Sequence, residues 1–301
     1  MTSTPQHITL EQLYSEWTEL MTEYPTMNMR LFRAVFDEWH QPTVEPEGVT
    51  YREDVVGGVP GIWTLPEGAD EKQVLVYTHG GGFAVGSASS HRKLAGHLAK
   101  ALGVVSFVLD YRRAPEHPHP AAVEDGVAVI DALIEAGIRP EDITTVGDSA
   151  GGNLAVAVPL SRREQGKPLP GQVIAFSPWL DMENKGETLA TNNDTDKLIT
   201  PELLEGMIAG VLGGTTEPTA PLANPLYAEY QDFPRTYITA GSVESLVDNA
   251  TRLEERMKAA GVDVTLVVSE GQQHVYPFEA GASDVADREI QSITAWYGQG
   301  R

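Results

Sequence analysis

The chain has 301 residues, of which 43 are acidic and 21 are basic, so its formal net charge is -22. A surface this acidic repels nucleic acid and anionic membranes, and we therefore predict neither as a partner. The sequence contains no cysteine, which excludes disulfides, thiolate metal ligands and a cysteine nucleophile.

Apolar periodicity predicts two helices within residues 8–40, interrupted near Pro25, with Thr9 and Gln12 forming a capping box at the first. Two strands separated by a Gly-Gly turn signal follow, and then buried strands alternate with helices. The predicted elements after the first two helices are strands at 49–56 and 61–66, a strand beginning at 73, a helix at 91–102, a strand at 104–111, a helix at 121–136, a strand at 143–147, a helix from 150 to about 165, strands at 172–180, 235–241 and 262–269, and a helix at 284–296.

This alternation of short Val- and Ile-rich runs with helices predicts an α/β fold with a mostly parallel sheet buried on both faces. Residues 181–223 interrupt it, because they are polar at first and then helical from about Pro201. They fall between two predicted strands. We therefore expect an insertion that lies over one edge of the sheet.

The sequence GDSAG at 147–151 fits the pattern G-x-S-x-G between a strand and a helix, which is the context of a nucleophile elbow. A serine at the tip of a tight turn projects its hydroxyl clear of the sheet. Gly147 and Gly151 leave room for close backbone approach, and the helix N-terminus directs free N–H groups at the reacting centre. Ser149 is thus the predicted nucleophile.

A serine nucleophile needs donors for the oxyanion that develops during the reaction, and HGGG at 79–82 follows the third strand where such a loop is expected. Consecutive glycines allow two backbone N–H groups to turn toward one point. A phosphate-binding loop is the alternative, but no G-K-[ST] follows and the G-x-G-x-x-G spacing fails at Val85. We interpret His79 as a hydrogen-bonding support of this loop, together with Gly80.

The serine also needs a base, and on this kind of fold the order along the chain is serine, acid, histidine. His274 follows the last predicted strand and has no competitor beyond His119. Two acids follow the strand at 235–241. Glu244 lies in the loop and is assigned to the triad, whereas Asp248, three residues after Ser245, is assigned to a capping box of the next helix. The other histidines lack metal-ligand spacing, so no metal site is predicted.

These residues resemble the hormone-sensitive-lipase-like (family IV) branch of the α/β-hydrolases. The resemblance rests on HGGGF, GDSAGGNLA, DYRRAPEHPHPAAVEDG, SPWLDM, ANPLY and GQQHVYPF, and it covers nearly everything from 74 to 299. It implies that Ser149 is the nucleophile and His274 the base, with oxyanion donors from the backbone of Gly81, Gly82 and Ala150. It also implies a central sheet of about eight strands, no cofactor, and a homodimer as a common assembly.

The resemblance further implies a helical cap over the site. On this interpretation the cap helices occupy 1–45 and 183–222, and the hydrolase core occupies 46–182 and 223–301. The chain departs from most of the branch at the acid, where Glu244-Ser245-Leu246 stands in place of aspartate followed by Pro-Leu. The subset with this feature is similar to bacterial esterases and to lactone hydrolases, including those that act on monoterpene ε-lactones.

The sequence therefore predicts a serine carboxylic-ester hydrolase that acts on small to medium acyl esters through an acyl-enzyme intermediate. A lactone hydrolase with the same triad is the alternative, and an amidase or deacetylase would use the same residues. Gibberellin receptors share the fold and bind small molecules without catalysis, but they have lost the triad histidine that is present here as His274. With no leader or membrane-span pattern, a cytoplasmic location is predicted.

Overall fold

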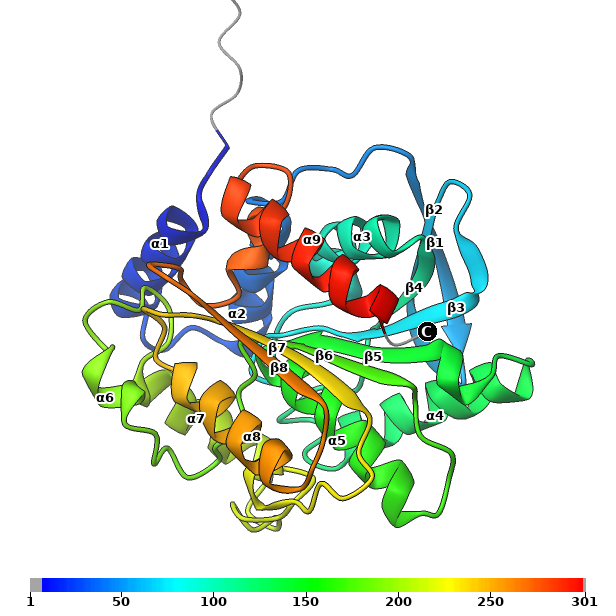
Figure 1. Ribbon diagram of the computed structural model, residues 1–301. Helices are drawn as coiled ribbons and strands as arrows, with labels where there is room; N and C mark the ends of the chain where they lie inside the picture. The colour runs from blue at the N-terminus through cyan, green and yellow to red at the C-terminus, as the bar shows by residue number, and fades with distance from the viewer. Residues whose placement is uncertain (1–6, 300–301) are drawn as a thin grey trace, which may run out of the picture.

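An eight-stranded sheet forms the centre of the computed structural model, which describes residues 7–299 (Figure 1). In spatial order its strands are β1 (Val49–Val56), β2 (Val59–Pro66), β4 (Val104–Leu109), β3 (Asp70–Thr78), β5 (Ile143–Asp148), β6 (Gln172–Phe176), β7 (Arg235–Gly241) and β8 (Val264–Ser269). The β1–β2 and β2–β4 pairs are antiparallel, and the other neighbouring pairs are parallel. The predicted α/β fold with a mostly parallel sheet of about eight strands is confirmed.

Helices cover both faces of this sheet, which explains why its central strands are continuous apolar runs rather than alternating ones. Every residue of β4, β5 and β6 is buried. In Figure 1, α3 (Ala88–Leu102) and α9 (Asp284–Gln299) lie on one face, whereas α4 (Ala121–Glu135), α5 (Ala150–Glu164) and α8 (Val247–Ala259) lie on the other.

The remaining helices come from the N-terminal segment and from the segment between β6 and β7. They are α1 (Leu10–Glu23), α2 (Met29–Phe36), the 3-10 helix η1 (Asp37–His40), α6 (Thr188–Thr191) and α7 (Pro201–Leu212). Side chains of α2, η1 and α7 line a small cavity at the end of β5. None of the helices within residues 7–299 has both the length and the apolar character needed to cross a membrane. Three short 3-10 turns complete the chain: η2 (Pro140–Asp142), η3 (Pro225–Tyr227) and η4 (Tyr276–Glu279).

Several element boundaries differ from the sequence prediction by a few residues, and two of these differences have identifiable reasons. Helix α3 begins at Ala88, three residues earlier than predicted, because Ser87 and Ser90 form a capping box that apolar periodicity does not reveal. Strand β6 ends at Phe176 rather than at 180, because Ser177 has a φ of 43° and turns the chain out of the extended conformation. This turn brings the Ser177 hydroxyl within hydrogen-bond distance of the Glu244 carboxylate.

Candidate active site

Ser149 lies in a strained turn between β5 and α5, as the pentapeptide motif predicts. Its φ is 53° and its ψ is -119°, a conformation that costs a non-glycine residue about 1–3 kcal/mol. A Cβ atom on Gly147 would lie 2.1 Å from the Gly151 carbonyl oxygen, and one on Gly151 would lie 1.9 Å from the Thr78 carbonyl oxygen. Both flanking positions therefore require glycine, because the backbones of the turn, the helix and β3 approach so closely.

The serine borders a cavity of about 20 Å³, which has room for about one water molecule. The cavity joins the elbow, the glycine loop and the helices outside the sheet. It is lined by Phe36, Trp39, Gly81, Gly82, Ser149, Trp179, Leu198, Ile199, Leu203, Leu204 and Met207. A second cavity, of about 560 Å³, lies between α1 and α2, and none of the predicted site residues lines it.

The glycine loop after β3 folds so that its backbone donors stay available. Gly81 has a φ of 109° and Gly82 a φ of 58°, and the Gly81 carbonyl accepts the N–H groups of Ala84 and Val85 at 3.0 and 2.9 Å. Within residues 7–299, the N–H groups of Gly81, Gly82 and Ala150 make no backbone hydrogen bond of a turn or loop. The loop and the first turn of α5 thus offer three donors beside Ser149.

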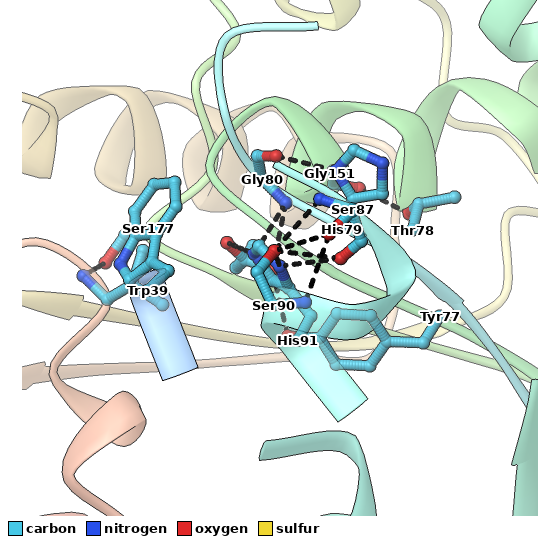
Figure 2. Close-up of polar contacts among 12 residues, drawn as sticks. Trp39, Tyr77, Thr78, His79, Gly80, Ser87, Ser90, His91, Gly151 and Ser177 are labelled. Atoms are coloured by element: carbon cyan, nitrogen blue, oxygen red, sulfur yellow. Dashed lines mark hydrogen bonds and ion pairs between the residues drawn. The ribbon is translucent and has the colours of Figure 1, made fainter. Parts of the chain in front are cut away.

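His79 lies in the core directly before this loop and contacts its backbone (Figure 2). Its Nδ1 lies 2.7 Å from the Gly80 carbonyl oxygen, and its ring stacks on Tyr111 with centroids 4.1 Å apart. The Tyr111 hydroxyl donates to the His79 carbonyl at 2.8 Å. Burial lowers the pKa of His79 well below its usual value, so the ring is neutral at neutral pH and its Nδ1–H can donate to the loop.

His274 and Glu244 lie together, both completely buried, although they follow different strands. The distance from His274 Nδ1 to Glu244 Oε1 is 3.6 Å. The other oxygen of Glu244 accepts two hydrogen bonds, from the Ser177 hydroxyl at 2.6 Å and from the Gly241 N–H at 3.0 Å. The carboxylate is therefore held in a fixed orientation with one oxygen directed at the imidazole.

The electrostatic surroundings of His274 favour its charged form. Burial by itself lowers the pKa of the imidazole, but contact with the Glu244 carboxylate, and then the charges of Glu244, Asp196 and Asp148, outweigh it and raise the pKa above the usual 6.5. A histidine with a raised pKa accepts a proton readily, and the partner carboxylate stabilises the cation that results.

Two further residues contact this pair and were not singled out from the sequence. The Ser177 hydroxyl, besides donating to Glu244, accepts the Val275 N–H at 3.0 Å and so joins the acid to the histidine loop. The Tyr14 hydroxyl of α1 donates to the His274 carbonyl oxygen at 2.9 Å and accepts from Trp39 Nε1 at 3.0 Å. SPWLDM was the only local signal for Ser177, and no local signal marked Tyr14.

The predicted capping box at Ser245 and Asp248 is wrong. Helix α8 has Leu246 at its N-cap, without a side-chain cap. The hydroxyl of Ser245 instead donates to the Ile199 carbonyl at 3.2 Å, and its N–H donates to Asp196 Oδ2 at 2.6 Å. Tertiary contacts with the segment before α7 have taken the groups that a capping box would use. Asp248 is half-buried and accepts from the side chain of its neighbour in sequence rather than from a histidine.

No three His, Asp or Glu side chains within residues 7–299 gather in a way that could hold a metal ion. What the arrangement does provide is a hydroxyl on a strained turn, three backbone donors beside it, and a buried histidine–carboxylate pair at neighbouring strand ends. These are the parts required for acyl transfer by a serine nucleophile.

Comparison with known proteins identifies the class to which this fold and site belong. The family described as α/β hydrolase fold matches residues 75–278, which is more than half of the chain, so the protein belongs to that family. A crystal structure of an esterase from the bacterial hormone-sensitive lipase (HSL) family matches 98% of each chain, with 36% sequence identity and a TM-score of 0.91. The resemblance to the hormone-sensitive-lipase-like branch is thus confirmed.

Relatives in sequence carry related names. An acetyl-hydrolase of Streptomyces hygroscopicus is 40% identical over 210 residues, which is 70% of this chain and 70% of the relative. A carboxylesterase of Mycobacterium tuberculosis is 32% identical over 228 residues, or 71% of this chain and 70% of the relative. The names of both relatives denote hydrolases.

Proposed function

We propose that the protein is a serine carboxylic-ester hydrolase that acts on small to medium acyl esters through an acyl-enzyme intermediate. The proposal is supported by the combination of a serine on a strained turn, a glycine loop whose N–H groups make no turn or loop hydrogen bond, and a buried histidine–glutamate pair after the neighbouring strands β7 and β8. The esterase and acetyl-hydrolase names of the relatives support the same conclusion.

In the proposed reaction His274 takes the proton of Ser149 as the hydroxyl attacks the ester carbonyl. Glu244 holds the imidazole in the tautomer that leaves Nε2 free to accept, and it stabilises the cation. The N–H groups of Gly81, Gly82 and Ala150 bind the oxyanion. The histidine then protonates the leaving alkoxide and later activates water to release the acid. This chemistry needs no cofactor.

We infer that residues 1–45 and 183–222 form a helical cap and that residues 46–182 and 223–301 form the core beneath it. On this proposal the cap determines which substrates reach the site. Residues 1–6 and 300–301 lie outside the described part of the chain. A cavity of about 430 Å³ is lined largely by α2, α7 and the residues before α2. It shares Leu203 and Met207 with the cavity at Ser149.

Met207 lines both cavities and packs against the glycine loop. A Cβ atom on Gly82 would lie 2.3 Å from Met207 Sδ, so the thioether rests directly on the loop. Because the cavity at Ser149 holds only about one water molecule, a substrate must displace this flexible side chain. The size of the adjoining cavity favours short and medium acyl chains.

The proposal is tested by hydrolysis of p-nitrophenyl esters from C2 to C12, with ε-caprolactone alongside, by the wild type, Ser149→Ala and Ser161→Ala. Ser161 is a matched control because it lies in α5, is buried, and its hydroxyl accepts a hydrogen bond from the Gln165 side chain, away from the proposed site. We expect short-ester turnover by the wild type and by Ser161→Ala, and loss of it in Ser149→Ala.

The two substrate classes decide between the remaining functions. A lactone rate above the ester rate would identify a lactone hydrolase that uses the same triad. If the wild type hydrolyses neither class, the enzymatic proposal is wrong and the fold serves as a small-molecule binder. Retained activity in Ser149→Ala would show that Ser149 is not the nucleophile.

A further inference from the structure

A completely buried carboxylate stands directly before the proposed nucleophile and takes no part in the proposed proton transfers. Asp148 occupies the second position of the pentapeptide motif, where the elbow geometry does not call for an acid. Its Oδ1 accepts the Tyr77 hydroxyl at 2.9 Å and the Gly80 N–H at 3.2 Å, and its Oδ2 lies 3.3 Å from His91 Nε2. Burial, followed by the charge of Asp148, raises the pKa of Tyr77 well above its usual value, so that hydroxyl stays a donor.

His91, on α3, contacts the Asp148 carboxylate and is held in place by polar and aromatic neighbours. It is completely buried, and its Nδ1 lies 2.8 Å from the Ser90 hydroxyl. Its Nε2 lies 3.1 Å from the Gly80 nitrogen, so the ring contacts both the loop and the carboxylate. Trp39 and Phe278 pack edge-on against the ring, with centroids 5.4 and 5.0 Å away.

Gly80 connects these contacts to the oxyanion loop. A Cβ atom on Gly80 would lie 2.2 Å from Asp148 Oδ2, so the carboxylate packs against the backbone of the loop as well as accepting its N–H. Gly80 directly precedes Gly81 and Gly82, whose N–H groups are the proposed oxyanion donors. A displacement of Gly80 would carry these donors away from the carbonyl that Ser149 attacks.

We propose that Asp148 and His91 are positioning residues that lock the oxyanion loop to the nucleophile turn. This inference rests on the proposed esterase function. The oxyanion exists only in the transition state, and interactions made only there contribute to kcat and not to substrate binding. Weakening the contacts of Asp148 and His91 with the oxyanion loop therefore lowers kcat and leaves KM almost unchanged.

From the contacts of Asp148 and His91 we also predict that the conservative substitution Asp148→Asn is tolerated. The Ser90 hydroxyl, which donates to the Ser87 carbonyl oxygen, lies 2.8 Å from His91 Nδ1, and His91 Nε2 accepts the Gly80 N–H and lies 3.3 Å from Asp148 Oδ2. In Asp148→Asn the amide oxygen still accepts from Tyr77 and Gly80. The amide NH₂ then donates to His91 Nε2, because a ring with its proton on Nδ1 can direct that proton at the Ser87 carbonyl oxygen, 3.2 Å away.

The test compares His91→Phe, which keeps the aromatic packing but loses the polar contacts, with Asp148→Asn. Tyr237→Phe is the control, because it removes a hydroxyl that donates at 2.8 Å to another buried carboxylate, Glu289, on α9. For each variant, kcat and KM on p-nitrophenyl butyrate, affinity for an alkyl trifluoromethyl ketone that forms an oxyanion adduct with the serine, and the melting temperature are measured.

In His91→Phe we expect kcat to fall about 10²-fold, the typical loss for one oxyanion donor, with KM within about twofold of the wild type. Ketone affinity should fall in parallel with kcat/KM. Asp148→Asn should keep kcat within about tenfold of the wild type, since every buried group retains a partner. Tyr237→Phe should lose stability without losing kcat.

Wild-type kcat and ketone affinity in His91→Phe would overturn the inference, whatever its melting temperature. If that variant does not fold, Tyr77→Phe replaces it. It removes one hydroxyl from the same carboxylate, and an unchanged kcat there would equally overturn the inference. Should Ser149→Ala retain full activity, the proposed function itself fails; should Ser149→Ala be inactive while His91→Phe behaves as wild type, only the positioning role fails.

Discussion

The two oxygens of the Glu244 carboxylate have different partners, and this makes Glu244→Gln an informative perturbation. Oε2 accepts from Ser177 and Gly241, so the single oxygen of the glutamine amide must occupy that place. The amide NH₂ then faces His274 Nδ1 and can only donate to it. The imidazole is forced to carry its proton on Nε2, the nitrogen that must accept the proton of Ser149.

A triad histidine in the wrong tautomer loses about 10⁴ in kcat, which corresponds to about 5.5 kcal/mol of transition-state stabilisation. Stability should change little, because both hydrogen bonds at Oε2 survive in Glu244→Gln and each is worth about 1 kcal/mol. The expected signature is thus a very large kinetic loss in a protein whose free energy of unfolding stays within about 2 kcal/mol of the wild type.

The assay is steady-state hydrolysis of p-nitrophenyl butyrate at neutral pH, combined with urea unfolding. Asp248→Asn is the matched control, because Asp248 follows the same strand without contacting the histidine. It should keep most of the activity. If Glu244→Gln retained activity within about tenfold of the wild type, the tautomer argument and the assignment of Glu244 as the triad acid would both be refuted.

Three other outcomes are expected. Met207→Ala should raise the octanoate-to-butyrate ratio of kcat/KM about tenfold, because it opens the passage to the larger cavity; an unchanged ratio would show that this side chain sets no length limit. The kcat/KM of the wild type should rise with pH through the raised pKa of His274, since only the neutral ring accepts a proton. Asp196→Asn should move this rise in kcat/KM to lower pH, because it removes a negative charge that raises the pKa of His274. Gly151→Ala should cost more than about 3 kcal/mol in urea unfolding because its Cβ would collide with backbone, whereas Gly298→Ala, in open space on α9, should be neutral or stabilising by up to about 1 kcal/mol.

The features predicted from the sequence share one physical property, which is that local chemistry determines them. The parallel sheet could be predicted because strands buried on both faces must be apolar along their whole length. The turn at Ser149 could be predicted because only glycine fits at 147 and 151, where a Cβ atom would lie about 2 Å from a neighbouring backbone oxygen. The loop after β3 could be predicted because consecutive glycines are needed to expose N–H groups.

The features that the sequence did not reveal depend on contacts between distant segments. Ser177 joins Glu244 to the histidine loop across 67 and 98 residues of chain, so no local pattern announces it. His91 lies 57 residues from its carboxylate partner and reads locally as a helix residue. The error at Asp248 has the same origin, because the contacts of Ser245 with Asp196 and the segment before α7 replaced a cap that the local sequence favours.

The hydrogen bond from the Tyr14 hydroxyl to the carbonyl oxygen of His274 joins residues 260 positions apart in the sequence. During synthesis α1 leaves the ribosome well before the histidine loop. On the proposed roles, a growing chain already holds the serine turn and the glycine loop yet lacks its base, so it stays inert toward cellular esters. Hydrolytic competence is then gained only after the histidine loop has been made and packs against α1, which was made long before it.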